Sequence, residues 1–213
     1  GTQRMRIGST EILVYYGEPS PHSLSQEIFI DLLPAETYIA PGVWTILLET
    51  GRVVDGRYQM WLPSEAALNP GTGFLLPSEE DTFTIPSTAS RVITVGAYDA
   101  LTFTYADFSG RGGQGEGYRI KPDLAAPGVG IMTRVPGGAV TAVTGTSFAT
   151  PFVTGGAALL MEWGIIKQND PYLYGEKIKA YLRKGARQLP GFDRYPNNQV
   201  GYGALCVEES IPY

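Results

Sequence analysis

The sequence of 213 residues has little of what carries redox, metal or nucleic-acid chemistry: one cysteine, one histidine and 16 scattered lysines and arginines. One thiol cannot form a disulfide within the chain, so packing must hold the fold together. The segment GYGALCV around Cys206 indicates a small apolar side chain rather than a reactive thiol. A net charge of −5 argues against nucleic acid as a partner, and we expect no cofactor.

Long apolar runs are also lacking. No uninterrupted run reaches the roughly 18 residues that span a bilayer, and no charged-then-apolar signal segment opens the chain, so we expect no membrane partner. What is present is 43% hydrophobic and 11% aromatic residues, which are sufficient for a buried core. We expect a soluble protein, or a piece of a longer one.

Residues 1–86 contain short β-like runs separated by Pro, Gly, Asn and Asp, a pattern typical of a β-sandwich. The pair Asp55-Gly56 fits a two-residue hairpin turn, and only residues 63–68 look helical. The pattern changes near residues 84–90, where we place a domain boundary. The runs are TEILVYY (10–16), QEIFIDLL (26–33), GVWTILLE (42–49), GRYQMWLP (56–63), TGFLL (72–76) and TFTIP (82–86).

The remaining residues, 87–213, have an α/β pattern. The apolar run RVITVGAYD (91–99) predicts a strand buried on both faces in a parallel sheet. Residues 147–163 predict a helix buried all round, in which Gly155 and Gly156 permit close packing. A second, amphipathic helix is predicted to begin at the N-cap Asp170 with Pro171 first and to stop at Gly185, with Tyr174, Ile178, Tyr181 and Leu182 on its apolar face.

The segment GTSFATP (145–151) places Ser147 at the start of the first helix. A serine needs a base and oxyanion donors to act as a nucleophile, and the free N–H groups of a helix N-terminus are such donors. Gly145 leaves room for a substrate beside the backbone, and Pro151 fits the first helical turn. The alternative is that Ser147 or Thr146 only caps the helix.

GTSFATP resembles the nucleophile signature of subtilisin-like serine proteases, in which the serine opens a long central helix. The resemblance implies that Ser147 is the catalytic nucleophile, that Gly145 and Thr146 form the oxyanion and nucleophile loop, and that the site uses no metal. Four more segments resemble this family in the same order: VITVGAYD (92–99), FSGRG (108–112), KPDLAAPGVGI (121–131) and GYGALC (201–206).

Two members of that family's catalytic triad have no counterpart in this sequence. The aspartate motif and the His-Gly-Thr helix start are absent, and the single histidine, His22, lies in a Pro/Ser-rich loop where we expect it to be solvated. The family's oxyanion asparagine is also absent, because Asn69, Asn169, Asn197 and Asn198 occur in other contexts. We therefore expect this chain alone to be inactive, and its partner to be a missing amino-terminal part of the same protease.

The β-rich residues 1–86 narrow the resemblance. They resemble the insert of the germination-associated, Csp-type subtilisin-like proteases of spore-forming clostridia, which carry a jelly-roll domain between histidine and serine. The predicted fold is α/β: a partial jelly-roll insert (1–86), then the carboxy-terminal portion of a subtilisin-like parallel-sheet domain (87–213). The resemblance implies a protein substrate, such as the precursor of a cortex-degrading hydrolase, and a spore-associated or extracellular location, without excluding the cytoplasm.

Three other features have simpler interpretations. The acidic groups at 79–81 and 208–209 lack the alternating ligand pattern of a calcium site and are expected to be surface charge. Asp123 is expected to be structural. The glycine-rich stretch 112–117 lacks the strand-to-helix context of a phosphate site.

The predicted function is that of a subtilisin-like serine endopeptidase which acts on a protein precursor in spore germination. The alternative is a catalytically inactive scaffold, a pseudoprotease. A third and weaker interpretation is a carbohydrate-binding jelly roll with Trp44, Tyr58 and Trp61 as its platform. Because a parallel sheet without its first strands exposes an apolar edge, we also expect dimerisation through that edge.

Overall fold

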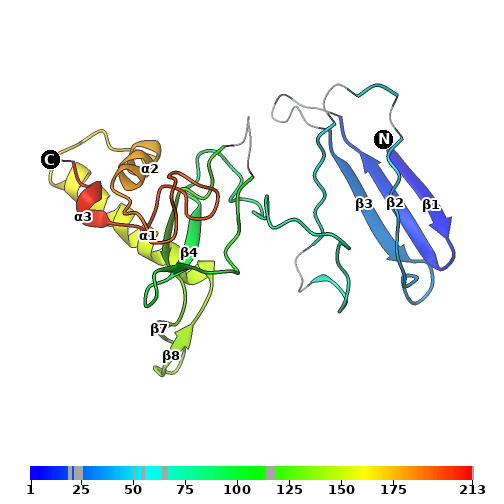
Figure 1. Cartoon of the computed structure of the whole chain (residues 1–213), viewed down its shortest axis with the longest axis horizontal. Helices are drawn as coiled ribbons and strands as arrows, with labels where there is room; N and C mark the ends of the chain where they lie inside the picture. The colour runs from blue at the N-terminus through cyan, green and yellow to red at the C-terminus, as the bar shows by residue number, and fades with distance from the viewer. Residues whose placement is uncertain are drawn as a thin grey trace. The chain divides into compact units, whose positions relative to one another are not determined.

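The computed structural model describes residues 1–18, 21, 26–49, 51–53, 56–63, 67–113 and 119–212. The chain divides into two compact units, residues 1–62 and residues 63–213 (Figure 1). This division lies upstream of the boundary expected between residues 86 and 87, so residues 63–86 belong to the second unit by their contacts.

The first unit is built on an antiparallel sheet with the strand order β1-β2-β3 (Figure 1). Its strands are β1 (Thr2–Ile7), β2 (Thr10–Tyr16) and β3 (Ile28–Pro34). The strands predicted at 10–16 and 26–33 are confirmed, and β1 is an addition. The signal for β1 was present in Met5 and Ile7, which alternate with polar residues before a turn at Gly8, where φ is 58°.

The later strands expected in the β-rich region are wrong. Described residues between 35 and 94 form no strand, so the strands predicted at 42–49, 56–63, 72–76 and 82–86 are absent. A strand needs a hydrogen-bonded neighbour, and these segments instead leave Val43, Leu47 and Leu76 exposed by 75%, 79% and 94%. The jelly roll therefore remains a prediction. Asp55 of the expected hairpin and residues 64–66 of the expected helix lie outside the described residues.

The second unit contains a small sheet with the strand order β5-β4-β6. β4 (Val95–Asp99) pairs in parallel with β6 (Leu124–Pro127), which confirms the parallel strand predicted at 91–99. β5 (Thr104–Tyr105) pairs antiparallel with the end of β4. The chain then forms the hairpin of β7 (Ile131–Arg134) and β8 (Val140–Val143), which leads directly into the first helix (Figure 1).

This helix, α1 (Thr146–Met161), continues as the π-helical turn η2 (Glu162–Ile166) and packs against β4 and β6. The helix predicted at 147–163 is confirmed, but its expected burial all round is wrong. The buried side is made of small residues and two larger ones, while Phe152, Leu159 and Met161 are exposed by 43%, 54% and 46%. One side of α1 lies on the sheet, and the described part of the chain leaves the other side uncovered. The buried residues are Ala149, Val153, Gly156 and Leu160.

The two glycines of α1 differ in their surroundings. A Cβ atom at Gly156 would lie 3.1 Å from Val207 Cγ2, so this glycine permits α3 (Val207–Ser210) to approach α1 closely, as predicted. Gly155 faces open space. Cys206, a free thiol, is half-buried at the N-cap of α3.

The second amphipathic helix, α2 (Gly175–Lys184), begins later than predicted. Asp170 does not cap it, because the Asp170 carboxylate binds Lys177 Nζ at 2.5 Å and accepts a hydrogen bond from Tyr181 at 3.0 Å. The predicted stop at Gly185 is confirmed. On the predicted apolar face, Ile178 and Leu182 are buried and Tyr181 is half-buried, whereas Tyr174 is exposed.

Residues Thr146–Ile166 form, among the described residues, one helical stretch long and apolar enough to cross a membrane by length and composition alone. The count of uninterrupted apolar residues missed it because Thr, Gly and Pro interrupt the run. Core helices of water-soluble folds meet the same criterion, so this is weak evidence for a membrane span.

Candidate active site

A glycine, and not a hydroxyl side chain, caps the helix that carries Ser147. The N-cap of α1 is Gly145, with φ 151° and ψ 158°, and no side chain makes a capping hydrogen bond there. Residues with a Cβ atom are strained at this φ, so the position requires glycine. The alternative in which Ser147 or Thr146 caps the helix is therefore wrong, and the Ser147 hydroxyl is free of that role.

Ser147 is the second residue of α1 and is exposed. The first N–H groups of an α-helix have no acceptor within the helix, and those of Thr146 and Ser147 are among them. The first turn holds no acidic residue, so nothing in it neutralises the positive end of the helix dipole. This arrangement suits an oxygen that gains negative charge beside Ser147.

Pro151 lies deeper in α1 than predicted, because it is the sixth residue of the helix and not part of its first turn. Proline has no N–H group, so the Ser147 carbonyl receives no hydrogen bond from the residue four positions on. Thr150 Oγ1 donates to the Thr146 carbonyl at 3.0 Å, and Thr154 Oγ1 donates to the Thr150 carbonyl at 3.2 Å. Threonine hydroxyls thus add hydrogen bonds to the first turns of α1.

A cavity of about 760 Å³ opens beside the first residue of α1. Its walls include Thr94 and Val95 near the start of β4, Phe108 and Thr146. β4 pairs with β5 only through Tyr98 and Asp99, so the beginning of β4 faces this cavity on that side. Open space therefore lies next to Thr146, the residue before the nucleophile candidate, and along a strand edge, although Ser147 does not itself line this cavity.

The described residues do not supply a general base for Ser147. None of them makes a hydrogen bond to Ser147 Oγ, and His22 lies outside the described residues. Three of the asparagines are engaged elsewhere: Asn169 Nδ2 donates to the Trp163 carbonyl at 2.9 Å, Asn197 Nδ2 to the Arg194 carbonyl at 3.0 Å and Asn198 Nδ2 to the Gly112 carbonyl at 3.1 Å. The arrangement is a serine with backbone donors, and it is not a complete triad.

Asp123 is fully buried and pairs with three cations, which agrees with the structural role expected for it. Lys179 Nζ lies 3.0 Å from Oδ1, and Lys121 Nζ lies 3.3 Å from Oδ2. Arg183 donates to Oδ1 through Nε at 2.8 Å and also through Nη2. Thr94 N–H donates to Oδ2 at 2.6 Å. One carboxylate thus ties β6 to α2 and to the segment before β4.

The lysines of this cluster are satisfied by backbone oxygens as well. Lys121 Nζ donates to the Val92 carbonyl at 3.0 Å, and Lys179 Nζ donates to the same carbonyl at 2.8 Å and to that of Ser90 at 2.9 Å. Burial lowers the pKa of Lys121, and the nearby Asp123 carboxylate opposes that shift. Sequence reasoning missed this cluster because an amphipathic pattern places Lys179 on the outer face of α2.

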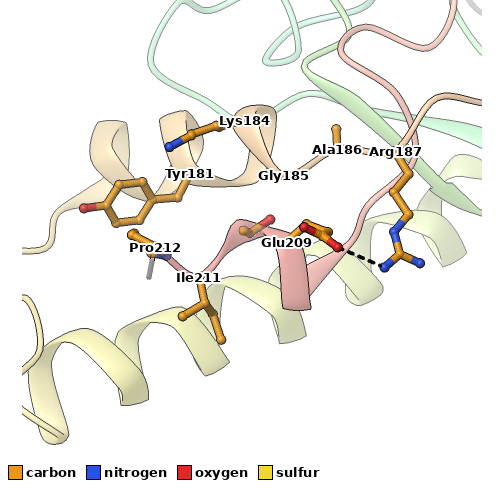
Figure 2. Close-up of a pocket in the computed structure, with 9 residues that line it drawn as sticks. Tyr181, Lys184, Gly185, Ala186, Arg187, Glu209, Ile211 and Pro212 are labelled. Carbon is orange, nitrogen blue, oxygen red and sulfur yellow. Dashed lines mark hydrogen bonds and ion pairs between the residues drawn. The ribbon is translucent and has the colours of Figure 1, made fainter.

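A second cavity, of about 470 Å³, lies between the C-terminal end of α2 and α3 (Figure 2). Arg187 pairs with Glu209 at its rim, at 3.5 Å, and with Glu208 at 3.6 Å. Ser147 does not line this cavity. Glu79, in the other acidic group, pairs with Arg111, and both groups are thus engaged with arginines near the surface. Among the described residues, no three or more His, Cys, Asp or Glu side chains come together as a metal site.

The sequence profile of the subtilase family matches residues 76–203, which is more than half of the chain. The chain therefore belongs to the subtilase family, and its second unit has a subtilisin-like α/β fold.

Among solved structures, the chain is similar to the CspB protease of Clostridium perfringens. The TM-score is 0.82 and the identity 38%, over 99% of this chain and 44% of that one. The prenylagaramide maturation protease PagA matches with a TM-score of 0.52 and 30% identity, over 62% of this chain and 46% of that one.

Two of the curated relatives are proteases of Bacillus subtilis (strain 168). Serine protease AprX is 33% identical over an alignment of 154 positions that covers 63% of this chain and 33% of AprX. Minor extracellular protease Vpr is 35% identical over an alignment of 120 positions that covers 53% of this chain and 14% of Vpr. The chain thus spans a third or less of these two relatives and less than half of CspB.

Proposed function

We propose that the protein to which this chain belongs is a subtilisin-like serine endopeptidase and that Ser147 is its nucleophile. The observation that carries the proposal is the exposed Ser147 hydroxyl at the second position of α1, behind a glycine N-cap, inside the segment that matches the subtilase family. Ser147 Oγ attacks the scissile carbonyl while a base removes its proton, and the leaving amine departs with a proton from that base. Water then hydrolyses the acyl-enzyme.

The oxyanion of each tetrahedral intermediate is stabilised by the backbone N–H of Ser147, which points out of the positive end of α1. Gly145 and Thr146 complete the nucleophile loop. Gly145 contributes no side chain, so the substrate carbonyl approaches the backbone closely. Thr146 borders the cavity of about 760 Å³ beside this site.

The base, its aspartate and the oxyanion asparagine are proposed to lie in polypeptide outside this chain. The chain covers 44% of the CspB chain, so a longer protein has ample room for them. The cavity along the start of β4 supports this assignment, because a further strand placed there would end next to Thr146. On this proposal the chain alone is inactive.

The substrate is proposed to be a protein precursor in spore germination, and the location to be spore-associated or extracellular. The similarity to CspB over 99% of the chain supports the first statement, and the extracellular relative Vpr supports the second.

The full-length protein, treated with a fluorophosphonate probe and then digested for mass spectrometry, tests the nucleophile. We expect one adduct, on Ser147. The variant Ser147→Ala should remove the adduct, and the matched variant Ser87→Ala, whose serine lines the cavity that Thr146 borders, should retain it. A folded full-length protein that forms no adduct on Ser147 would overturn the proposal and favour the alternative, a pseudoprotease scaffold.

A further inference from the structure

The junction between β8 and α1 fixes the place of Ser147, and a ladder of hydrogen bonds defines it. Gly128, directly after β6, donates its N–H to the Tyr98 carbonyl on β4 at 3.0 Å. Its carbonyl accepts the Gly145 N–H at 2.8 Å. The N-cap of α1 is thus connected to the central strand through a single intervening residue.

Gly128 also has no space for a side chain. A Cβ atom there would lie 2.7 Å from Ala97 Cβ and 3.1 Å from the Gly145 carbonyl oxygen. The start of α1 therefore lies so close to the sheet at Gly128 that no side chain fits between them. A small displacement of this junction moves Ser147 with it, since only Thr146 separates Ser147 from the N-cap.

One rung of the ladder uses a side chain. The β7–β8 pairing ends at Ile131 and Val143, where the two chains diverge. Beyond that pair, the Gly130 N–H donates to Thr144 Oγ1 at 3.0 Å. The Thr144 hydroxyl thus closes the base of the hairpin between the last backbone pair and the Gly128–Gly145 bond.

We propose that Thr144 is a positioning residue for the Ser147 nucleophile, an inference that rests on the proposed function. Its Oγ1 holds Gly130 and so keeps the residues on both sides of the hairpin base in register. Without that acceptor, the Gly145–Gly128 bond is the one hydrogen bond that the structure shows between residues 128–130 and 144–145. The attacking oxygen and the oxyanion donor of Ser147 then sample a wider range of positions, which slows acylation more than it weakens substrate binding.

The test compares three variants in the full-length protein. Thr144→Val removes the acceptor with little change of shape, and Thr144→Ser restores a hydroxyl. Thr141→Val is the matched control, because it makes the same change on an exposed residue of the same hairpin. Each variant is measured for the rate of fluorophosphonate labelling at Ser147, for kcat and KM on a peptide substrate, and for Tm.

We expect Thr144→Val to lower the labelling rate and kcat by about tenfold with KM nearly unchanged, because small misplacements of reacting groups have effects of this order. Thr144→Ser and Thr141→Val should stay near the parent protein, and the two valine variants should have similar Tm values. Parental labelling in Thr144→Val would overturn the inference. So would a loss of labelling that only follows the loss of folded protein.

Hydrogen exchange separates this inference from the proposed function. In Thr144→Val, the amides of residues 128–130 and 145–148 should exchange faster, and in Thr141→Val they should not. If the parent protein is never labelled at Ser147, the proposed function fails, and unchanged exchange in Thr144→Val shows that Thr144 does not hold the junction either. Labelled parent protein with unchanged exchange overturns the inference alone.

Discussion

Replacement of Asp123 by alanine tests the cluster that holds the second unit together. The carboxylate is fully buried, and the side chains of its lysine partners Lys121 and Lys179 are exposed by 7% and 8%. Asp123→Ala leaves these two ammonium groups and the Arg183 guanidinium in place without the counter-charge. Removal of one partner from a buried ion pair costs about 3–5 kcal/mol, because the remaining charge stays desolvated.

That cost is a large fraction of the stability of an ordinary domain, which is about 5–15 kcal/mol. A loss of about 1 kcal/mol lowers Tm by about 2–4 °C for a unit of this size, so we expect a decrease of about 6–20 °C. Circular dichroism of the full-length protein gives the measurement. Asp107→Ala, on an exposed aspartate, is the matched control and should change stability by less than about 0.5 kcal/mol.

The double variant Asp123→Ala with Lys121→Met sharpens this test. Removing one of the uncompensated cations should recover part of the lost Tm, since the two residues share one interaction. If Asp123→Ala melts within about 2 °C of the parent protein, the buried carboxylate is not the centre of the cluster and the reasoning is refuted.

Two further predictions concern pH and assembly. Burial lowers the pKa of Lys121 from its ordinary value of 10.5. Between the lowered value and 10.5, the unfolded chain therefore binds a proton that the folded chain does not. The free energy of unfolding increases as pH rises through that window. Urea midpoints from pH 7 to pH 10 should therefore improve for the parent protein relative to Lys121→Met, and parallel profiles would contradict this. The isolated 213-residue chain should self-associate through the start of β4, which has no strand paired to it on the β5 side, and should show a weight-average mass that rises with concentration in sedimentation equilibrium. A monomer at all concentrations would contradict this.

The start of α1 was predictable because its signals are local. GTSFATP combines a glycine, a serine near the helix start and a run of small residues, and each acts on the backbone within a few positions. The parallel strand at 91–99 was predictable for a similar reason, since a continuous apolar run has few other uses in a fold of this class.

The errors concern features that depend on distant residues. The runs at 42–49 and 72–76 have β-like composition, but a strand exists only where a neighbour accepts its hydrogen bonds. The start of α2 was placed at Asp170, a good capping residue, although that carboxylate instead binds Lys177. Burial of Phe152 was assumed from its apolar character, whereas burial requires a surface that covers it.

The candidate site also combines features that the local sequence predicts with features that depend on distant residues. The sequence identified Ser147, but it could not distinguish a capping serine from a free one, because that depends on the φ of Gly145. The Thr144 bond to Gly130 spans the whole β7–β8 hairpin, and no spacing rule indicates it. The Asp123 cluster brings together residues about 60 positions apart, from Asp123 to Arg183.

Because the base of the β7–β8 hairpin is closed, changes at its tip should not displace Ser147, and this is useful in protein engineering. The tip at residues 135–139 is held by its own turn, in which Val135 N–H donates to the Ala139 carbonyl at 3.0 Å and Gly138 N–H to the Val135 carbonyl at 2.9 Å. Lengthening an exposed turn adds only a slowly growing entropy cost. A peptide tag or a reporter inserted at Gly137 should therefore leave the serine where it is, while the same insertion at Gly130 should displace it.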